Sequence, residues 1–142
     1  MNYIQVQSEK DQDVPYLLSV HRLPEIKRFI GIDEANYFRY VTTTENVFYF
    51  KAYWNEKLVG TVHCELKDGV LYLSILVIPG FQRRGIGTEI LRDMQKKAFP
   101  LSFDRIVASI EKQNDASLGL FRKMGFVRVE EDGELVDVSW PA

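Results

Sequence analysis

The residues with the clearest potential for chemistry follow an apolar run that ends at Ile78 and Pro79. A chain that leaves a strand, passes through a glycine loop and enters a helix presents unpaired N–H groups and the positive end of the helix dipole, which together bind phosphate. Gly85 and Gly87 would let a pyrophosphate approach the backbone, because neither residue has a Cβ. Two arginines precede them, so the segment predicts a site for a phosphorylated ligand; it reads Gln82-Arg83-Arg84-Gly85-Ile86-Gly87-Thr88.

Two common phosphate-binding loops do not fit this segment. A dinucleotide-binding fingerprint needs a third glycine, and the corresponding position holds Ile90. A P-loop needs Gly-Lys-Ser/Thr, whereas Gly87 is followed by Thr88 and Glu89. What remains is the pattern Q-x-x-G-x-G at a strand–helix junction.

A second motif lies between Asn114 and Phe126, where the sequence reads NDASLGLFRKMGF. With the glycine loop, it resembles the two signature motifs of the GNAT superfamily of N-acetyltransferases. The resemblance extends over essentially the whole chain, with its identifying residues at 71–127. It implies the GNAT fold, in which the central sheet splays open to admit acyl-CoA, and it implies acetyl-CoA as the cofactor.

The resemblance also implies roles for individual residues. Backbone groups of the strand before the loop would pair with the pantetheine arm, the loop and helix start would hold the pyrophosphate, and the second motif would contact the far side of the arm. A plain N-cap role for Asn114 is an equally good interpretation, and the two roles are compatible. The implied cofactor-binding residues are Leu76, Val77, Ile78, Gln82, Arg83, Arg84, Gly85, Ile86, Gly87, Thr88, Asn114, Ser117 and Phe121.

Transfer of an acetyl group from a thioester to an amine needs a base for the amine, a donor for the oxyanion and an acid for the thiolate. Many GNAT members have a tyrosine acid at the position of Phe121, and phenylalanine has no proton to give. Positions that often hold a carboxylate base are occupied by Leu73 and Ser109. The hypothesis from the remaining residues is that Glu65 is the base and Tyr72 the acid; the alternative is that both belong to a polar outer face of a hairpin.

The elements that must position these residues can be read from periodicity. A short strand is expected near residues 3–7, followed by a helix with Val14, Leu17 and Leu18 on its apolar side, for which Asp11 and Asp13 are cap candidates. A second short helix is expected to start at Pro24 and to stop at Gly31. Residues 47–54, 58–66 and 71–78 are rich in β-branched and aromatic residues and predict three antiparallel strands. Pairing through the Asp68-Gly69 turn would place Glu65 opposite Tyr72.

The remaining segments predict a helix from 86 to about 97, a strand at 105–111, a helix at 115–124 and strands at 126–129 and 135–138. The order is β-αα-βββ-α-β-α-ββ, a mixed α+β class. The strand–helix–strand crossovers favour parallel neighbours, so the sheet cannot be purely antiparallel.

Length and composition favour one domain over residues 1–142, with 46% hydrophobic residues and a net charge of −2. That charge argues against a nucleic-acid partner, and no apolar segment is long enough to cross a membrane. The one cysteine, Cys64, cannot form an internal disulfide and lies on an apolar stripe, which indicates an inert core thiol. Two histidines and one cysteine do not make a standard structural zinc site, so no metal is expected. A cytoplasmic location is expected.

The predicted function is therefore direct, acetyl-CoA-dependent N-acetylation of a primary amine in a ternary complex. The acceptor is a small-molecule or protein amine, recognised by the variable residues 21–54. A homodimer through the terminal strands is conceivable, as in some GNAT members. The alternative from another class is a non-catalytic acyl-CoA-binding regulatory or interaction module, which the phenylalanine at position 121 motivates.

Overall fold

The computed structural model of the chain describes residues 1–141, which contain five helices and seven strands. The order matches the predicted one except for an additional short helix before the central strands. The strands are β1 (Asn2–Gln5), β2 (Val47–Trp54), β3 (Lys57–Lys67), β4 (Val70–Val77), β5 (Arg105–Glu111), β6 (Val127–Asp132) and β7 (Leu135–Trp140). The helices are α1 (Val14–His21), α2 (Pro24–Lys27), α3 (Tyr37–Thr43), α4 (Ile86–Gln95) and α5 (Asp115–Lys123).

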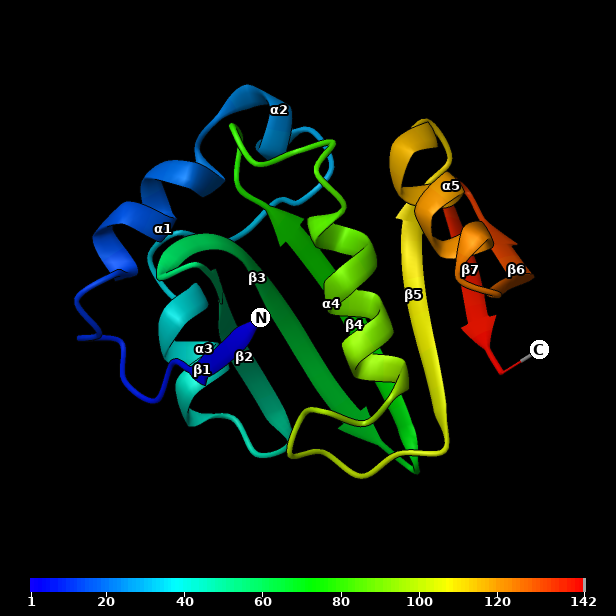
Figure 1. Cartoon of the computed structure of the whole chain (residues 1–142), viewed down its shortest axis with the longest axis horizontal. Helices are drawn as coiled ribbons and strands as arrows, with labels where there is room; N and C mark the ends of the chain where they lie inside the picture. Colours follow the sequence, from blue (N-terminus) through cyan, green and yellow to red (C-terminus); the bar gives the residue numbers. More distant parts are fainter. Residues whose placement is uncertain (142) are drawn as a thin grey trace.

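All seven strands form one sheet in the order β1-β2-β3-β4-β5-β7-β6. Every neighbouring pair is antiparallel except β4 and β5, which are parallel, as the crossover through α4 requires. The parallel ladder joins only residues 70–72 to residues 105–107. Beyond these residues β4 and β5 separate toward their carboxyl ends, which leaves an open V in the middle of the sheet (Figure 1).

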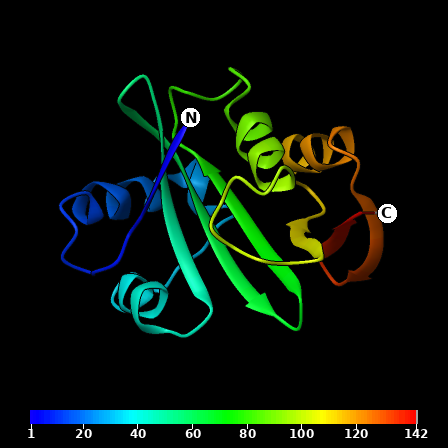
Figure 2. The same ribbon diagram turned by 60° about the horizontal axis from the view of Figure 1, so that its bottom comes forward.

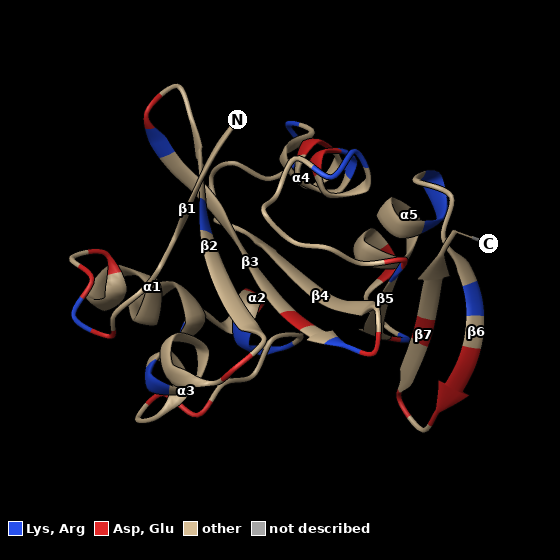
Figure 3. Cartoon of the chain, turned by 90° about the horizontal axis from the view of Figure 1, so that it is seen from below, with Lys and Arg blue, Asp and Glu red and all other residues tan. Residues whose placement is uncertain are grey.

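The two faces of the sheet are covered by different helices. Figures 2 and 3 place α4 and α5 on one side, and α1, α2 and α3 on the other. Side chains alternate between these faces along each strand. Thus Leu71 and Leu73 of β4 belong to the core beneath α4 and α5, whereas Leu76 packs with Ile26 of α2 on the opposite face.

The start of α1 differs from its expected capping. Asp13 is the N-cap residue of α1, but its side chain accepts no hydrogen bond from the helix, and the Asp11 carboxylate accepts one only from the backbone N–H of Asp13, at 2.9 Å. Both carboxylates instead bind the buried ammonium of Lys51 on β2, with Nζ–O distances of 3.0 and 2.8 Å. An uncompensated buried ammonium is very unfavourable, so this ion pair outweighs a cap in that position. Burial lowers the pKa of Lys51, but the hydrogen bonds to Asp13 and Asp11 outweigh burial and raise it overall.

The additional helix α3 is the element that periodicity did not predict. It is a segment of low helix propensity, with threonines and tyrosines, and its only apolar signal is Phe38 with Val41 one turn later. Both of these side chains are buried against Tyr49 and its neighbours, so tertiary packing stabilises the helix. The predicted second helix is shorter than expected, because α2 ends at Lys27. Among residues 1–141 no helix is both long and apolar enough to span a membrane.

Candidate functional site

A groove of about 530 Å³ occupies the open V between β4 and β5. This volume lies in the range typical of small-molecule and cofactor sites. Its walls come from β4, from the loop that enters α4, from the first turns of α5 and from α2. Of the predicted cofactor-binding residues, those that line the groove are Leu76, Val77, Gln82, Arg83, Gly85, Ile86, Gly87, Thr88, Asn114, Ser117 and Phe121.

The backbone of β4 offers hydrogen-bonding groups to this groove at alternate residues. The N–H of Ile78 donates to the carbonyl of Val59 at 2.9 Å, so alternation turns the N–H and C=O groups of Val77 and Ile75 away from β3 and toward the V. Because the Val77 carbonyl points away from β3, the side-chain amide of Gln82 can donate a hydrogen bond to it, at 3.3 Å. Ile78 is a correction to the expected set, because it is buried, its N–H is already paired and it does not line the groove.

The first turn of α4 forms one end of the groove. Its N-cap, Gly85, has a left-handed φ of 79° and no side chain to cap the helix, and the first intrahelical bond runs from the N–H of Glu89 to the Gly85 carbonyl. The N–H groups of the turn therefore remain free to bind an anion. Arg83 lines the groove, whereas Arg84 does not; the Arg84 guanidinium lies 5.7 Å from the centre of the Phe81 ring, and its role in binding pyrophosphate stays a prediction.

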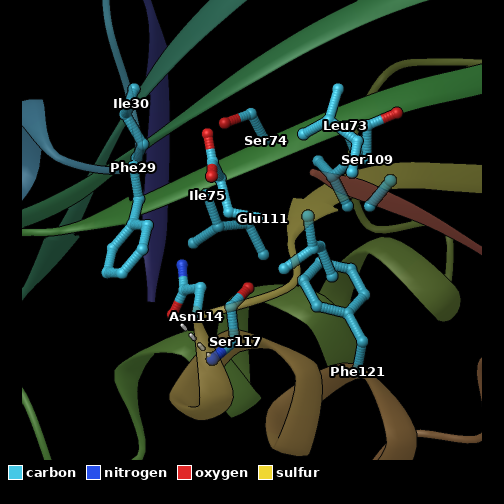
Figure 4. A pocket seen from close by; sticks show the side chains of 13 residues that line it. Phe29, Ile30, Leu73, Ser74, Ile75, Ser109, Glu111, Asn114, Ser117 and Phe121 are labelled. Carbon is cyan, nitrogen blue, oxygen red and sulfur yellow. Dashed lines mark hydrogen bonds between the residues drawn. The ribbon is translucent and has the colours of Figure 1, made fainter. Parts of the chain in front are cut away.

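The start of α5 forms the opposite wall. Asn114 is the N-cap of this helix, and its Oδ1 accepts a hydrogen bond from the Ser117 N–H at 3.2 Å. Figure 4 shows the amide nitrogen of Asn114 and the hydroxyl of Ser117 turned toward the space between α5 and β4. Phe121 is 3% exposed and packs edge-to-face on Phe126, so it gives this space an apolar floor.

A smaller cavity of about 100 Å³ adjoins the groove and shares several walls with it, including Ile75 and Phe121. It lies where β4 and β5 have separated, and Phe29 and Ile30, from the variable segment after α2, close one side of it. Its single ionisable side chain is Glu111, the last residue of β5 (Figure 4). Sequence reasoning missed Glu111, although its position at the end of a strand beside the second motif was a usable signal.

Glu65 and Tyr72 face each other across the β3–β4 ladder, as predicted, and His63 faces Ser74. His63 Nε2 lies 2.6 Å from a Glu65 oxygen, and the Tyr40 hydroxyl donates to the other oxygen at 3.0 Å. Neither Glu65 nor Tyr72 lines the groove or the cavity, and Tyr72 is 44% exposed. A role in proton transfer would require a relay through His63 and Ser74, and it stays a prediction.

Cys64 lies on the other face of this hairpin, under α4. It has no exposed surface, and burial raises the pKa of its thiol well above the ordinary range. A neutral, buried thiol is a poor nucleophile, and an electrophile such as a thioester cannot reach it. The expectation of an inert core cysteine agrees with this environment.

Comparison with known proteins gives one family match. Residues 14–126 match the model of the acetyltransferase (GNAT) family. These residues include the glycine loop, both walls of the groove and the second sequence motif.

Known proteins similar to the chain agree with the family model. A curated relative, the N-alpha-acetyltransferase MAK3 of Arabidopsis thaliana, is 25% identical over 87 residues, which are 57% of this chain and 45% of that protein. The chain therefore aligns with less than half of that relative's length.

Among solved structures, the Campylobacter jejuni N-acetyltransferase PseH in complex with acetyl coenzyme A matches with a TM-score of 0.78 at 15% identity, covering 97% of this chain and 96% of that one. The spermidine N-acetyltransferase of Vibrio cholerae, in complex with CoA and spermine, has a TM-score of 0.78 at 14% identity and coverages of 97% and 93%. At these identities the two structures establish a shared fold.

Proposed function

The chain belongs to the GNAT family of acetyltransferases, and from this premise we propose that it is an acetyl-CoA-dependent N-acetyltransferase acting on a primary amine. The observation that carries the proposal is the groove in the splayed sheet, one end of which is the uncapped N-terminus of α4. The proposed reaction is direct transfer with both substrates bound together.

Acetyl-CoA fits the residues of the groove. The free N–H groups at the start of α4, together with the Arg83 guanidinium, suit a pyrophosphate. The outward-facing N–H and C=O groups of Ile75 and Val77 suit an extended amide-containing arm, which would lie beside β4 as an added strand. Acetyl-CoA supplies an activated acetyl group as a thioester.

The amine is assigned to the smaller cavity, because that cavity shares Ile75, Ser117 and Phe121 with the groove and so adjoins the end of the arm. An amine held there and a thioester held in the groove would be brought together without a covalent enzyme intermediate, which is the entropic advantage of a ternary complex. Known relatives include enzymes named for the acetylation of N-alpha amines and of spermidine, which supports an amine acceptor.

Two further requirements of acyl transfer can be assigned to this chain. The N–H of Ile75 faces the V and is a candidate donor for the developing oxyanion. Phe121 cannot protonate the departing thiolate, so the proton for the sulfur has to come from the attacking amine or from water. The Glu65–Tyr72 pair is the alternative source proposed from sequence.

The competing proposal is a binding module that holds acyl-CoA without turnover, and it is favoured by the apolar Phe121 at the floor of the site. Both proposals require the groove to bind acyl-CoA, and only one requires release of CoA when an amine is present.

A thermal-shift titration with acetyl-CoA, with ATP and NAD as controls, tests the shared requirement. At a concentration 100 times Kd, binding adds about 2.7 kcal/mol to the free energy of unfolding, which should raise Tm by roughly 5–10 °C. No selective shift with acetyl-CoA would contradict both proposals. Release of CoA thiol is then followed with spermine and with a short peptide carrying a free α-amino group as probes, and turnover of either one eliminates the binding module.

A further inference from the structure

We propose that Glu111 is the residue that binds the ammonium group of the acceptor and takes its proton. This inference rests on the proposed function and deepens it, because it names a catalytic residue and the class of acceptor. Glu111 lies in the gap of the splayed sheet, its carboxylate has no partner among residues 1–141, and it is the one charged side chain in the cavity lining.

The alternation of side chains places Glu111 on the acceptor side of the sheet. On β5, Ile106, Ala108 and Ile110 point into the core under α4 and α5, so Ser109 and Glu111 point to the opposite face. On β4 the same argument places Ser74 on that opposite face, since Leu73 belongs to the core. Glu111 therefore reaches the gap from the side opposite to α4, and Figure 4 shows its carboxylate extending toward β4.

The Glu111 carboxylate is also free to bind a ligand. It makes no hydrogen bond or salt bridge with any side chain of residues 1–141 and is only partly exposed. Its neighbour Lys112 does not neutralise it, because Lys112 Nζ lies 3.5 Å from a carboxylate oxygen of Glu131.

Two other carboxylates on the neighbouring strands are already engaged. Glu65 is bound by His63 and Tyr40 on the far side of Ser74. Asp137 on β7 accepts the Ser109 hydroxyl at 2.5 Å and does not line the cavity. Glu111 is thus the one anionic side chain in the cavity lining with free acceptor oxygens.

The walls around Glu111 define the acceptor class. The cavity measures about 100 Å³, and its walls combine apolar side chains with uncharged polar ones. The apolar walls include Phe29, Ile30, Ile75 and Leu135, and the polar ones are Ser74, Ser109, Asn114 and Ser117. A single carboxylate in a small cavity whose other walls carry no charge favours a primary amine, whose ammonium pairs with the carboxylate and whose first methylene groups contact the apolar walls. A hydroxyl or an amide at the same place would leave the carboxylate without a cationic partner.

The Glu111 carboxylate takes one proton from the ammonium, which gives the neutral amine a lone pair. Nitrogen attacks the thioester carbonyl carbon, the C–N bond forms, the C–S bond breaks and sulfur leaves with the bonding electrons. The second proton lost by nitrogen goes to the sulfur, directly or through water. The proton on Glu111 is released to solvent.

Binding of two CoA thioethers tests this assignment without knowledge of the natural acceptor. S-(3-aminopropyl)-CoA extends an ammonium from the sulfur, and S-butyl-CoA is its neutral counterpart with the same number of heavy atoms. Since hydrogen bonds to charged groups are among the stronger ones, the wild type should bind the aminopropyl compound about tenfold more tightly by calorimetry. Glu111→Gln should lose this preference and keep its affinity for S-butyl-CoA.

Two further variants make the result specific. Glu134→Gln removes the same charge from the adjacent β6–β7 turn and should retain the full preference. Glu65→Gln tests the rival carboxylate. The proposal is overturned if Glu111→Gln retains the preference, if the wild type shows none, or if Glu65→Gln alone abolishes it. Failure of both thioethers to bind would instead contradict the proposed function.

Activity gives an independent readout with the amine probe that is turned over. Glu111→Gln should lower kcat at least a hundredfold, the usual scale of general-base catalysis, while the KM for acetyl-CoA stays within about twofold. Glu111→Asp, which keeps the charge on a shorter side chain, should recover part of kcat. Equal kcat values for the wild type and Glu111→Gln would overturn the assignment.

Discussion

Asn114 Oδ1 accepts a hydrogen bond from the backbone N–H of Ser117, while the amide nitrogen of the same side chain faces the cavity between α5 and β4 (Figure 4). One side chain therefore combines the observed cap with a second function that we propose, ligand binding, on a different atom. The oxygen stabilises the helix that forms one wall of the groove, and the nitrogen is free to donate to a bound ligand. The two functions can be separated by substitution, because aspartate caps a helix as well as asparagine does.

Asn114→Asp and Asn114→Ala should therefore have different effects. Alanine removes the cap, so the free energy of unfolding should fall by about 1 kcal/mol and Tm by a few degrees. Aspartate should leave Tm within about 1 °C. Both variants lose the donor, so acetyl-CoA affinity by calorimetry should fall about tenfold in each. Unchanged affinity in Asn114→Asp would mean that Asn114 is only a cap.

The absence of a side chain at Gly87 should matter more for CoA affinity than for the stability of the fold. A Cβ at this position would lie 3.0 Å from a methyl group of Leu120 and 3.7 Å from one of Val77, and all three residues line the groove. Gly87→Ala should thus narrow the groove and weaken CoA binding at least tenfold, with little change in Tm because the leucine methyl can move.

Gly119 on the exposed side of α5 provides the matched control for that substitution. A Cβ there would meet no atom within 4 Å, and alanine is the better helix former. Gly119→Ala should raise the free energy of unfolding by about 0.5–1 kcal/mol and leave CoA affinity unchanged. If both glycine variants bind CoA as the wild type does, the close approach at Gly87 has no role in binding.

Cys64 should take no part in catalysis. Because its thiol is fully buried and its pKa is raised by that burial, a disulfide reagent should label no thiol in the native protein and one per chain in denaturant. Cys64→Ala should retain turnover within about twofold and lose about 1–2 kcal/mol of stability from the cavity it creates. An acetylated Cys64, or loss of turnover in a folded Cys64→Ala protein, would indicate a route through an acetyl-enzyme.

The central elements could be predicted because their local signals agree with their tertiary environment. The Asp68-Gly69 turn and the alternation around it set the register that places Glu65 opposite Tyr72 and Cys64 in the core. The glycine loop and the Asn114 cap depend on short-range chemistry, and both are found where the motifs indicated. These are the segments in which one or two residues decide the local backbone conformation.

The remaining features depend on contacts between distant residues. Packing of Phe38 and Val41 on β2 stabilises helix α3. The Asp13 carboxylate pairs with Lys51, which is 38 residues later in the sequence. The place of Glu111 in the cavity follows from the separation of β4 and β5, which depends on where their parallel ladder ends. Sequence periodicity gives the face of a strand but not the residue at which two strands part.

His21 of α1 is a buried histidine whose environment disfavours its charged form. It is 4% exposed, its Nε2 lies 3.4 Å from the Tyr49 hydroxyl, and its Nδ1 has no hydrogen-bond partner among residues 1–141. Burial, and then the proximity of His63, lower the pKa of His21 to about 4, against a small opposing effect of Glu34. In the unfolded chain the imidazole would titrate near pH 6.5.

The folded protein should therefore lose stability on acidification through this residue. Between about pH 6.5 and pH 4 the unfolded state binds a proton at His21 that the folded state does not, so the free energy of unfolding falls as pH falls across that window. From pH 7 to pH 5 the contribution is about 2 kcal/mol. His21→Gln removes the titrating group, so its urea midpoint should fall less than that of the wild type between these two pH values. The difference between the two slopes gives the contribution of His21 together with its coupling to His63, and equal slopes would mean that His21 is protonated in the folded state without cost.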